Sequence, residues 1–198
     1  MEFQDVISKR RMVRNYTEAP VASESLERII DAGLKAPSAG NSQGIGFVVV
    51  TDSEHRREIA ELADEPAYVS AGFDRWISKA PVHIVISVSE EAYHERYREA
   101  DKLGTDGEEV EWPVPFWWVD AGAAMMGVLL AAVDEGLSAG FLGVHAISDL
   151  SKSVGLPKDH HPIGIVTIGH PAPDRRSGSL ARGKRIRESV VHRERWGS

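Results

Sequence analysis

The sequence predicts an α+β sandwich rather than a doubly wound sheet. Some segments repeat apolar residues at helical spacing, and others are short β-branched runs bounded by turn residues. The two kinds of segment do not alternate strictly, as the strands and helices of a doubly wound sheet would. With 198 residues and 42% hydrophobic content, the chain can form a real core. We expect a single domain over residues 1–198.

Two amphipathic helices are predicted in the first third of the chain. Residues 23–35 open with Ser23, a candidate N-cap, and place four apolar side chains on one face: Leu26, Ile29, Ile30 and Leu34. Residues 53–63 form the second amphipathic segment.

A third predicted helix, over residues 118–135, is apolar on nearly every side. It carries small side chains that let a neighbouring helix approach closely, namely Ala121, Gly122, Ala123, Ala124 and Gly127. Its apolar stretch 119–133 is shorter than the roughly 20 residues that a membrane span needs. We therefore expect a buried or interfacial helix and no membrane association.

Four strands are predicted from short apolar runs with turn residues at their flanks. They cover residues 47–50, 82–88, 140–144 and 163–168. The adjacent histidines 160 and 161 point apart on most backbones and have no third ligand nearby, so we expect a surface loop there and no metal site.

Composition excludes several classes of function. A net charge of −7 argues against a nucleic-acid binder, which would carry a basic surplus. The absence of cysteine excludes disulfides, thiol nucleophiles and iron–sulfur clusters, so any redox chemistry needs a cofactor. The N-terminus has no secretory signal pattern, which makes a cytoplasmic location the default expectation.

Two regions depart from the globular pattern. Acidic residues crowd between Glu90 and Glu111 and end at a tryptophan- and proline-rich run, so residues 90–118 are predicted to be an excursion that could serve as a lid. Tryptophans 112, 117 and 118 could line a substrate pocket or a dimer interface. Residues 171–198 have little apolar periodicity and many arginines. Such an arm cannot fold alone and should lie on another surface.

Positive charge is concentrated at the two ends of the chain. Residues 1–14 and 175–198 together hold 12 of the 23 lysines and arginines: Lys9, Arg10, Arg11, Arg14, Arg175, Arg176, Arg182, Lys184, Arg185, Arg187, Arg193 and Arg195. If the ends meet, their guanidinium groups could bind one phosphate dianion. The alternative is that these charges are simply solvated.

Two further segments have polar or flexible groups suited to a flat ligand. The loop 37–43 offers hydroxyl and amide groups that could bind the edge of a heterocycle, or it could be an ordinary connector. The glycines of segment 140–143 could bring backbone close to a ring, or could only end a strand.

Taken in order, these segments resemble the nitroreductase family of FMN enzymes. Ser8 to Tyr16 resembles the family's arginine-rich entry, and 36–43 resembles its flavin-facing loop. Residues 140–143 lie where the family passes backbone over the flavin, and 184–192 resemble its basic C-terminal segment. The sequence departs from the family where Gly44 and Ile45 replace a frequent proline and aromatic residue.

The resemblance implies a cofactor site and a fold. FMN would be bound by Arg10, Arg11, Met12, Arg14, Pro37, Ser38, Asn41, Gln43, Gly140, Leu142, Gly143, Lys184 and Arg185. Met12 stands where a serine is frequent, so it would contribute its backbone N–H. The implied fold has a mostly antiparallel sheet flanked by helices, in a homodimer whose C-terminal arms are exchanged.

The implied activity is reduction of a nitroaromatic, quinone or related conjugated acceptor by a ping-pong mechanism, with NADH or NADPH as donor. Because the cofactor carries the chemistry, no catalytic acid or base is expected. The alternatives are a flavin-dependent dehalogenase or dehydrogenase on the same fold, or a non-catalytic flavin-binding module.

Overall fold

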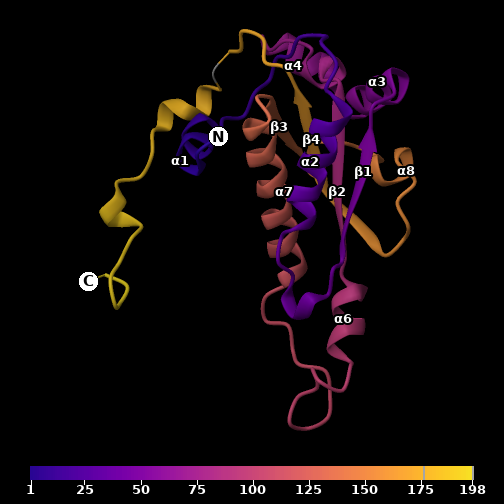
Figure 1. The fold of residues 1–198 in the computed structure, drawn as a ribbon, viewed down its shortest axis with the longest axis vertical. Helices are drawn as coiled ribbons and strands as arrows, with labels where there is room; N and C mark the ends of the chain where they lie inside the picture. Colours follow the sequence, from indigo (N-terminus) through magenta and orange to yellow (C-terminus); the bar gives the residue numbers. More distant parts are fainter. Residues whose placement is uncertain (176, 198) are drawn as a thin grey trace.

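The computed structural model describes residues 1–175 and 177–197, so the tail cation Arg176 lies outside the described residues. The helices are α1 (Phe3–Lys9), α2 (Ser23–Leu34), α3 (Ser53–Leu62), α4 (Glu65–Ser70), α5 (Trp76–Lys79), α6 (Glu91–Tyr97), α7 (Phe116–Asp134) and α8 (Leu150–Ser153). The strands are β1 (Ile45–Val50), β2 (Val82–Ser89), β3 (Ser138–Gly143) and β4 (His160–Gly169). Figure 1 shows their arrangement.

The four strands form one sheet in the order β1-β2-β4-β3, and every neighbouring pair is antiparallel. The predicted α+β class with an antiparallel sheet is therefore confirmed. The central strand β2 is buried along its whole length. Strand β3 lies at an edge, which leaves half of its backbone groups facing away from β4.

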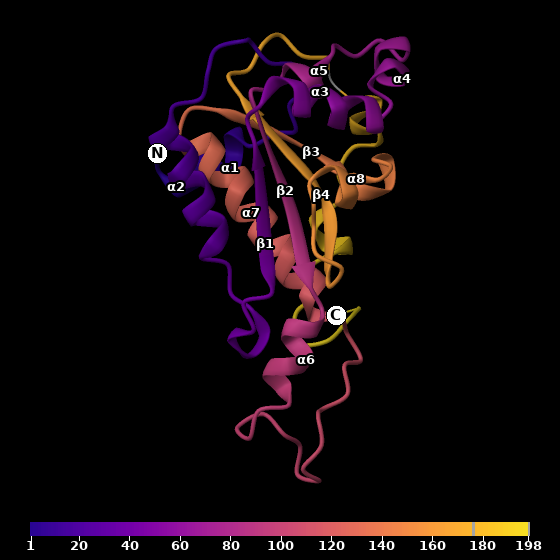
Figure 2. The same cartoon turned by 90° about the vertical axis from the view of Figure 1, so that its right-hand side faces the viewer.

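Alternate residues of each strand enter two different cores, as the two-residue period of a strand requires. On β2, Ile84 and Ile86 pack beneath α2 and α7, whereas Val85 packs beneath α3, α5 and α8. Figure 2 shows the sheet between these two helical layers. The sandwich thus follows directly from apolar side chains on both faces of the central strands.

Helices α2 and α7 approach closely because glycine lies at their contact. A Cβ on Gly127 would stand 2.9 Å from the backbone oxygen of Ala32, and one on Gly33 would stand 2.7 Å from Val128. The prediction that small residues of the long apolar helix admit a neighbour is confirmed at Gly127, whereas a Cβ on Gly122 would have no neighbour within 4 Å. The predicted N-cap is wrong, because Ala22 is the N-cap residue and no side chain caps α2. Leu34 is exposed rather than part of the buried face.

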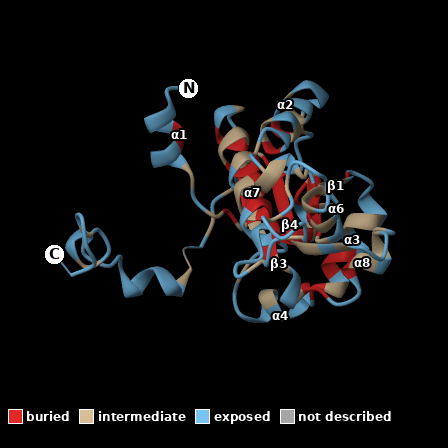
Figure 3. Cartoon of the chain, turned by 90° about the horizontal axis from the view of Figure 1, so that it is seen from below, coloured by how far each residue is buried: buried red, intermediate tan, exposed pale blue. Residues whose placement is uncertain are grey.

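Helix α7 is the one helix in the described part of the chain that is long and apolar enough to span a membrane. Its inner face, including Ala121, Ala124 and Val128, is buried against the sheet. Figure 3 shows this buried stripe within the core. A core position explains the apolar composition of α7 only in part, because Phe116, Trp118, Val119 and Met126 are exposed.

Four segments differ from the expected pattern or project from the body. Residues 90–118 contain helix α6, followed by a long loop that leads into α7. Both α1 and residues 177–197 extend away from the sheet (Figure 3). His160 and His161 begin strand β4, so the expected surface loop at these histidines is wrong. They pair there with Ser89 and Val88, which lengthens the strand beyond its apolar run.

Candidate active site

The arginine-rich N-terminal segment lies beside the start of β3. Met12 forms an isolated parallel bridge with Ala139, and Val13 N–H donates to the Ala139 carbonyl at 3.0 Å. Tyr16 is buried beneath this segment, and its hydroxyl lies 3.1 Å from the Val13 carbonyl and 2.9 Å from Thr167 Oγ1. Burial raises the pKa of Tyr16, so its hydroxyl stays protonated as a donor.

Gly140 is required by this close approach. A Cβ at this position would clash with the Val13 carbonyl and lie 3.2 Å from the Tyr16 hydroxyl. Two predicted site segments, around Met12 and around Gly140, are therefore brought together. Leu142 is buried in the core, so only its backbone could face a ligand. Gly143 packs beside the ring of His145.

The cationic side chains of the N-terminal segment point in different directions. Lys9 and Arg11 line a hollow of about 280 Å³ together with Ser138 at the start of β3. The Arg14 guanidinium instead lies 5.8 Å from the ring centres of Phe73 and Trp76. Arg10 caps the C-terminal end of α1 and is half-buried.

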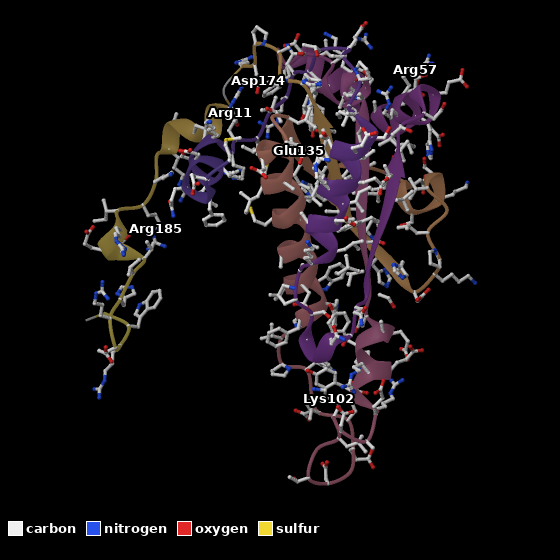
Figure 4. The ribbon with its side chains drawn as sticks, viewed as in Figure 1. Arg11, Arg57, Lys102, Glu135, Asp174 and Arg185 are labelled. Carbon is white, nitrogen blue, oxygen red and sulfur yellow. The ribbon has the colours of Figure 1, made fainter. Side chains whose placement is uncertain are left out.

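A carboxylate organises these arginines. Asp174 Oδ2 accepts from the Arg14 backbone N–H at 3.0 Å and lies 3.3 Å from Arg11 Nη1. Asp174 Oδ1 is buried and has no hydrogen-bond partner among the described residues. Figure 4 shows Arg11 and Asp174 side by side between α1 and the first residues of the arm. The acidic residue was missed in the sequence because a lone Asp after two prolines has no recognisable pattern.

The C-terminal arm is anchored at its base and then leaves the body. Asn15 Nδ2 donates to the Pro173 carbonyl at 2.8 Å, and Ala172 N–H donates to the Asn15 carbonyl. Further along, Lys184 and Arg185 are exposed, and Arg185 lies well away from Arg11 (Figure 4). Within one chain, residues 171–175 therefore contact the N-terminal segment. The basic residues 184–185 do not reach the N-terminal arginines.

The polar loop 37–43 lies at the other end of α7. Its Ala39 N–H donates to Asp120 Oδ2 at 2.8 Å, close to the start of that helix. Within the loop, Gln43 N–H donates to Ser38 Oγ at 3.0 Å. The side chains of Pro37, Asn41 and Gln43 are exposed, so the amide groups of Asn41 and Gln43 are available to a ligand.

The predicted lid packs over this loop with an aromatic cluster. Trp112 contacts the rings of Tyr93, Tyr97, Phe116 and Trp117, and its indole N–H donates to Glu109 at 2.9 Å. His94 pairs with the same carboxylate, which raises the pKa of His94. Trp117 is buried in this cluster, whereas Trp118 remains largely exposed.

The two groups of site residues are thus separated within one chain. Asp120 marks the loop end of α7 and Asp134, which pairs with the N-terminal amine, marks the arginine end. The 14-residue separation corresponds to about 21 Å along a helix.

The fold and the arrangement of these residues fit the flavin oxidoreductase class that the sequence motifs predicted. An antiparallel sandwich presents a cationic end, an open strand edge and a polar loop, in the chain order of the resemblance. The chain belongs to the nitroreductase family, whose family model, described as "Nitroreductase family", matches residues 7–170. The predicted family is confirmed.

Known relatives agree with this assignment. An FMN reductase [NAD(P)H] of Bacillus subtilis is 33% identical over 201 residues, which cover 96% of this chain and 72% of that protein. The solved structure of a hypothetical oxidoreductase, YcnD, from Bacillus subtilis has a TM-score of 0.74 and 28% identity, over 98% of this chain and 74% of that one. Iodotyrosine deiodinase 1 of Rattus norvegicus is 35% identical over 80 residues, covering 39% of this chain and 28% of that protein.

Proposed function

We propose that this protein is an FMN-dependent NAD(P)H oxidoreductase that reduces a small nitroaromatic, quinone or related conjugated acceptor in the cytoplasm. Membership of the nitroreductase family supports the enzyme class, and the relative named FMN reductase [NAD(P)H] supports the cofactor and donor. The observation that carries the proposal is the contact of the arginine segment with the open edge of β3.

The donor groups of this end fit a phosphate and a ribityl chain. Arg10 and Arg11 supply guanidinium groups, for which a phosphate dianion is a well-matched partner. The Arg14 guanidinium lies over the rings of Phe73 and Trp76, so it would have to turn away from them to contact the same phosphate. Because Met12 has no hydroxyl, its backbone N–H would take the place of a side-chain donor.

The edge of β3 and the loop 37–43 fit the ring of the cofactor. Gly143 leaves the backbone of the edge strand partly exposed, whereas Gly140 is buried and admits the Val13 carbonyl beside the strand. Ser38, Asn41 and Gln43 can donate to and accept from a heterocycle edge. However, the loop lies about 21 Å along α7 from the arginine end, so one chain alone would hold only one part of the site.

A homodimer resolves this separation. If the α7 helices of two subunits pack antiparallel about a two-fold axis, the loop end of each helix meets the arginine end of the other. Each FMN would then contact both subunits. Apolar side chains are exposed where such a contact would form: Phe3, Ile7, Val119 and Met126. These would be buried by the second subunit.

The C-terminal arm fits the same arrangement. Residues 177–197 leave the body with exposed apolar side chains, including Ile186 and Trp196, which are 70% and 84% exposed. An arm of this kind gains stability only by covering another surface. Exchange of arms between subunits would bury these side chains and carry Lys184 and Arg185 to a phosphate.

The roles of the protein are binding, orientation and exclusion of water. Bound FMN would supply hydride transfer between NAD(P)H and an acceptor that uses the same pocket in turn, and ping-pong kinetics are expected for this reason. Arg10, Arg11 and Arg185 would hold the phosphate. Loop 37–43 would orient the ring, and the lid 90–118 would limit which molecules reach it. Backbone N–H groups of the β3 edge would donate hydrogen bonds to the ring.

Anaerobic reduction of the purified protein tests this function. Bound flavin is first identified by mass, and its absorbance band is then followed after mixing with NADH and with NADPH. Bleaching by either donor, followed by recovery of the band when a quinone or nitroaromatic is added, is expected. Protein that takes up no FMN even in excess would refute the proposal. A bound flavin that neither donor bleaches would instead indicate a non-catalytic module.

Reductive dehalogenation is the second candidate, because iodotyrosine deiodinase 1 is among the relatives. Turnover assays with halogenated phenols, quinones and nitroaromatics separate the two reactions. Halide release without reduction of quinones or nitro compounds would favour the dehalogenase.

A further inference from the structure

A buried carboxylate joins the loop 37–43 to the lid. Asp120 lies on α7 with only 8% of its surface exposed. Its Oδ2 atom accepts from Ala39 N–H of the loop and from the Tyr93 hydroxyl of α6, each at 2.8 Å. Burial and the bond to this carboxylate raise the pKa of Tyr93, so its hydroxyl remains a donor at physiological pH. One oxygen atom thus connects two segments that are 54 residues apart in sequence.

The loop needs such a restraint because its backbone is strained. Gly40, Asn41 and Gln43 have φ angles of 61°, 58° and 53°. The left-handed region costs free energy for residues with a Cβ, so Asn41 and Gln43 hold it only where neighbouring groups stabilise it. Ser38 Oγ supplies one internal bond, to Gln43 N–H. Asn41 N–H donates to the Ser38 carbonyl at 2.9 Å, and the N–H and Oγ of Ser42 donate to the Ala39 carbonyl at 3.1 and 2.7 Å. Further restraints come from outside the loop.

Helix α6 supplies these outside restraints. Arg96 Nε donates to the Gly40 carbonyl at 3.0 Å, and its two terminal nitrogens are held by Asp101 at 2.8 and 2.7 Å. The Tyr97 ring covers Gly40 so closely that a Cβ there would stand 2.6 Å from a ring carbon. The loop and α6 therefore touch through a hydrogen bond, a ring contact and the shared carboxylate.

We infer that Asp120 is a positioning residue that fixes the flavin-facing loop and couples it to the lid, so that both move as one unit. This inference rests on the proposed function, since it assigns the loop to a bound FMN. Opening of the lid would withdraw Tyr93 and Arg96 and release the loop from its strained geometry. The lid would thereby control cofactor affinity as well as acceptor access.

The first test is Asp120→Asn in the purified holoprotein. Asparagine preserves the size of the side chain but removes the charge that strengthens both hydrogen bonds. We expect the FMN dissociation constant to rise about tenfold. Backbone amides 39–43 of the apoprotein should also exchange faster with deuterium. Asp52→Asn is the matched control, because Asp52 accepts from Glu54 and His55 backbone N–H groups at the far side of the molecule.

The second test is Tyr93→Phe, which removes only the bond from the lid and keeps the aromatic packing. We expect a rise in the FMN dissociation constant of roughly threefold and faster exchange of the same loop amides. If Asp120→Asn does not fold, this variant decides the question alone. Where both fold, the double variant should bind FMN more tightly than the product of the two single effects predicts, because both substitutions act on the same hydrogen bond.

Three results separate the possible failures. Wild-type protein that binds no FMN would refute the proposed function. Wild-type protein that binds FMN, while Tyr93→Phe matches it in affinity and loop exchange, would overturn the coupling of lid and loop. Asp120→Asn that changes FMN affinity and loop exchange no more than Asp52→Asn would overturn the role of the carboxylate.

Discussion

Replacing Met126 by aspartate tests whether α7 forms the subunit contact. Met126 lies on the exposed side of α7 and is 41% exposed in the single chain. Complete burial of a methionine contributes about 1.5–3 kcal/mol, so burial of the remaining 41% would contribute about 0.6–1.2 kcal/mol per copy. A two-fold contact contains the residue twice, which doubles this figure.

Aspartate at this position also places an unpaired charge in the contact. The penalty for an uncompensated buried charge reaches several kcal/mol. Together with the lost apolar burial, this should weaken the dimer by more than about 100-fold, since each 1.4 kcal/mol is a factor of ten. Sedimentation equilibrium measures the change directly, and FMN content should fall with the dimer fraction.

Val69→Asp serves as the control for Met126→Asp. Val69 lies on α4, away from α7, and its exposure of 38% is nearly the same. This variant should remain dimeric and keep its flavin. If Met126→Asp has the same dimer dissociation constant and the same flavin content as Val69→Asp, then α7 does not form the subunit contact. The proposal of a site shared by two subunits would then be wrong.

Three further predictions concern single residues. Arg10→Ala should weaken FMN binding by roughly 1.5–3 kcal/mol through loss of a charge-assisted hydrogen bond, whereas Arg57→Ala, on α3, should leave the dissociation constant unchanged. Gly140→Ala should lower stability by about 1–3 kcal/mol through the clash with the Val13 carbonyl, measured as a lower Tm; an unchanged Tm would contradict the close approach. The hydrogen bond to Glu109 raises the pKa of His94, so this pair stabilises the lid fully below pH 6.5 and less as pH rises through the raised pKa. Proteolysis within residues 98–111 should accelerate over that range, and His94→Gln should remove the pH dependence.

Residues with regular periodicity were predictable from sequence alone. The four strands and helices α2, α3 and α7 were all expected, and the observed ends differ from the expected ones by at most three residues. Their patterns are local, because burial on one face or both faces fixes which residues are apolar. Helices α4, α5 and α8 have four to six residues, too few for a periodic pattern to appear.

The sequence motifs predicted which segments would form the candidate site. They did not predict the side chains that hold those segments in place. The arginine segment and Gly140 were expected to be close, and the structure brings them together through Val13. Asp120 and Asp174 were missed because their partners are backbone N–H groups and side chains far away in sequence. Such pairs depend on the tertiary fold, and a single sequence contains no periodic signal for them.

The separation of the two half-sites has a thermodynamic consequence. If the arginine end of one subunit and the loop end of the other share one FMN, the cofactor binds the dimer more tightly than the monomer. Linkage then requires that FMN stabilise the dimer by the same factor. Asp120 joins each lid to the loop 37–43 of the same subunit. The lid of one subunit would therefore cover a flavin whose phosphate is bound by the arginines of the other subunit. Weakening the α7 contact would therefore reduce flavin content, and weakening the loop would reduce the stabilisation of the dimer by flavin.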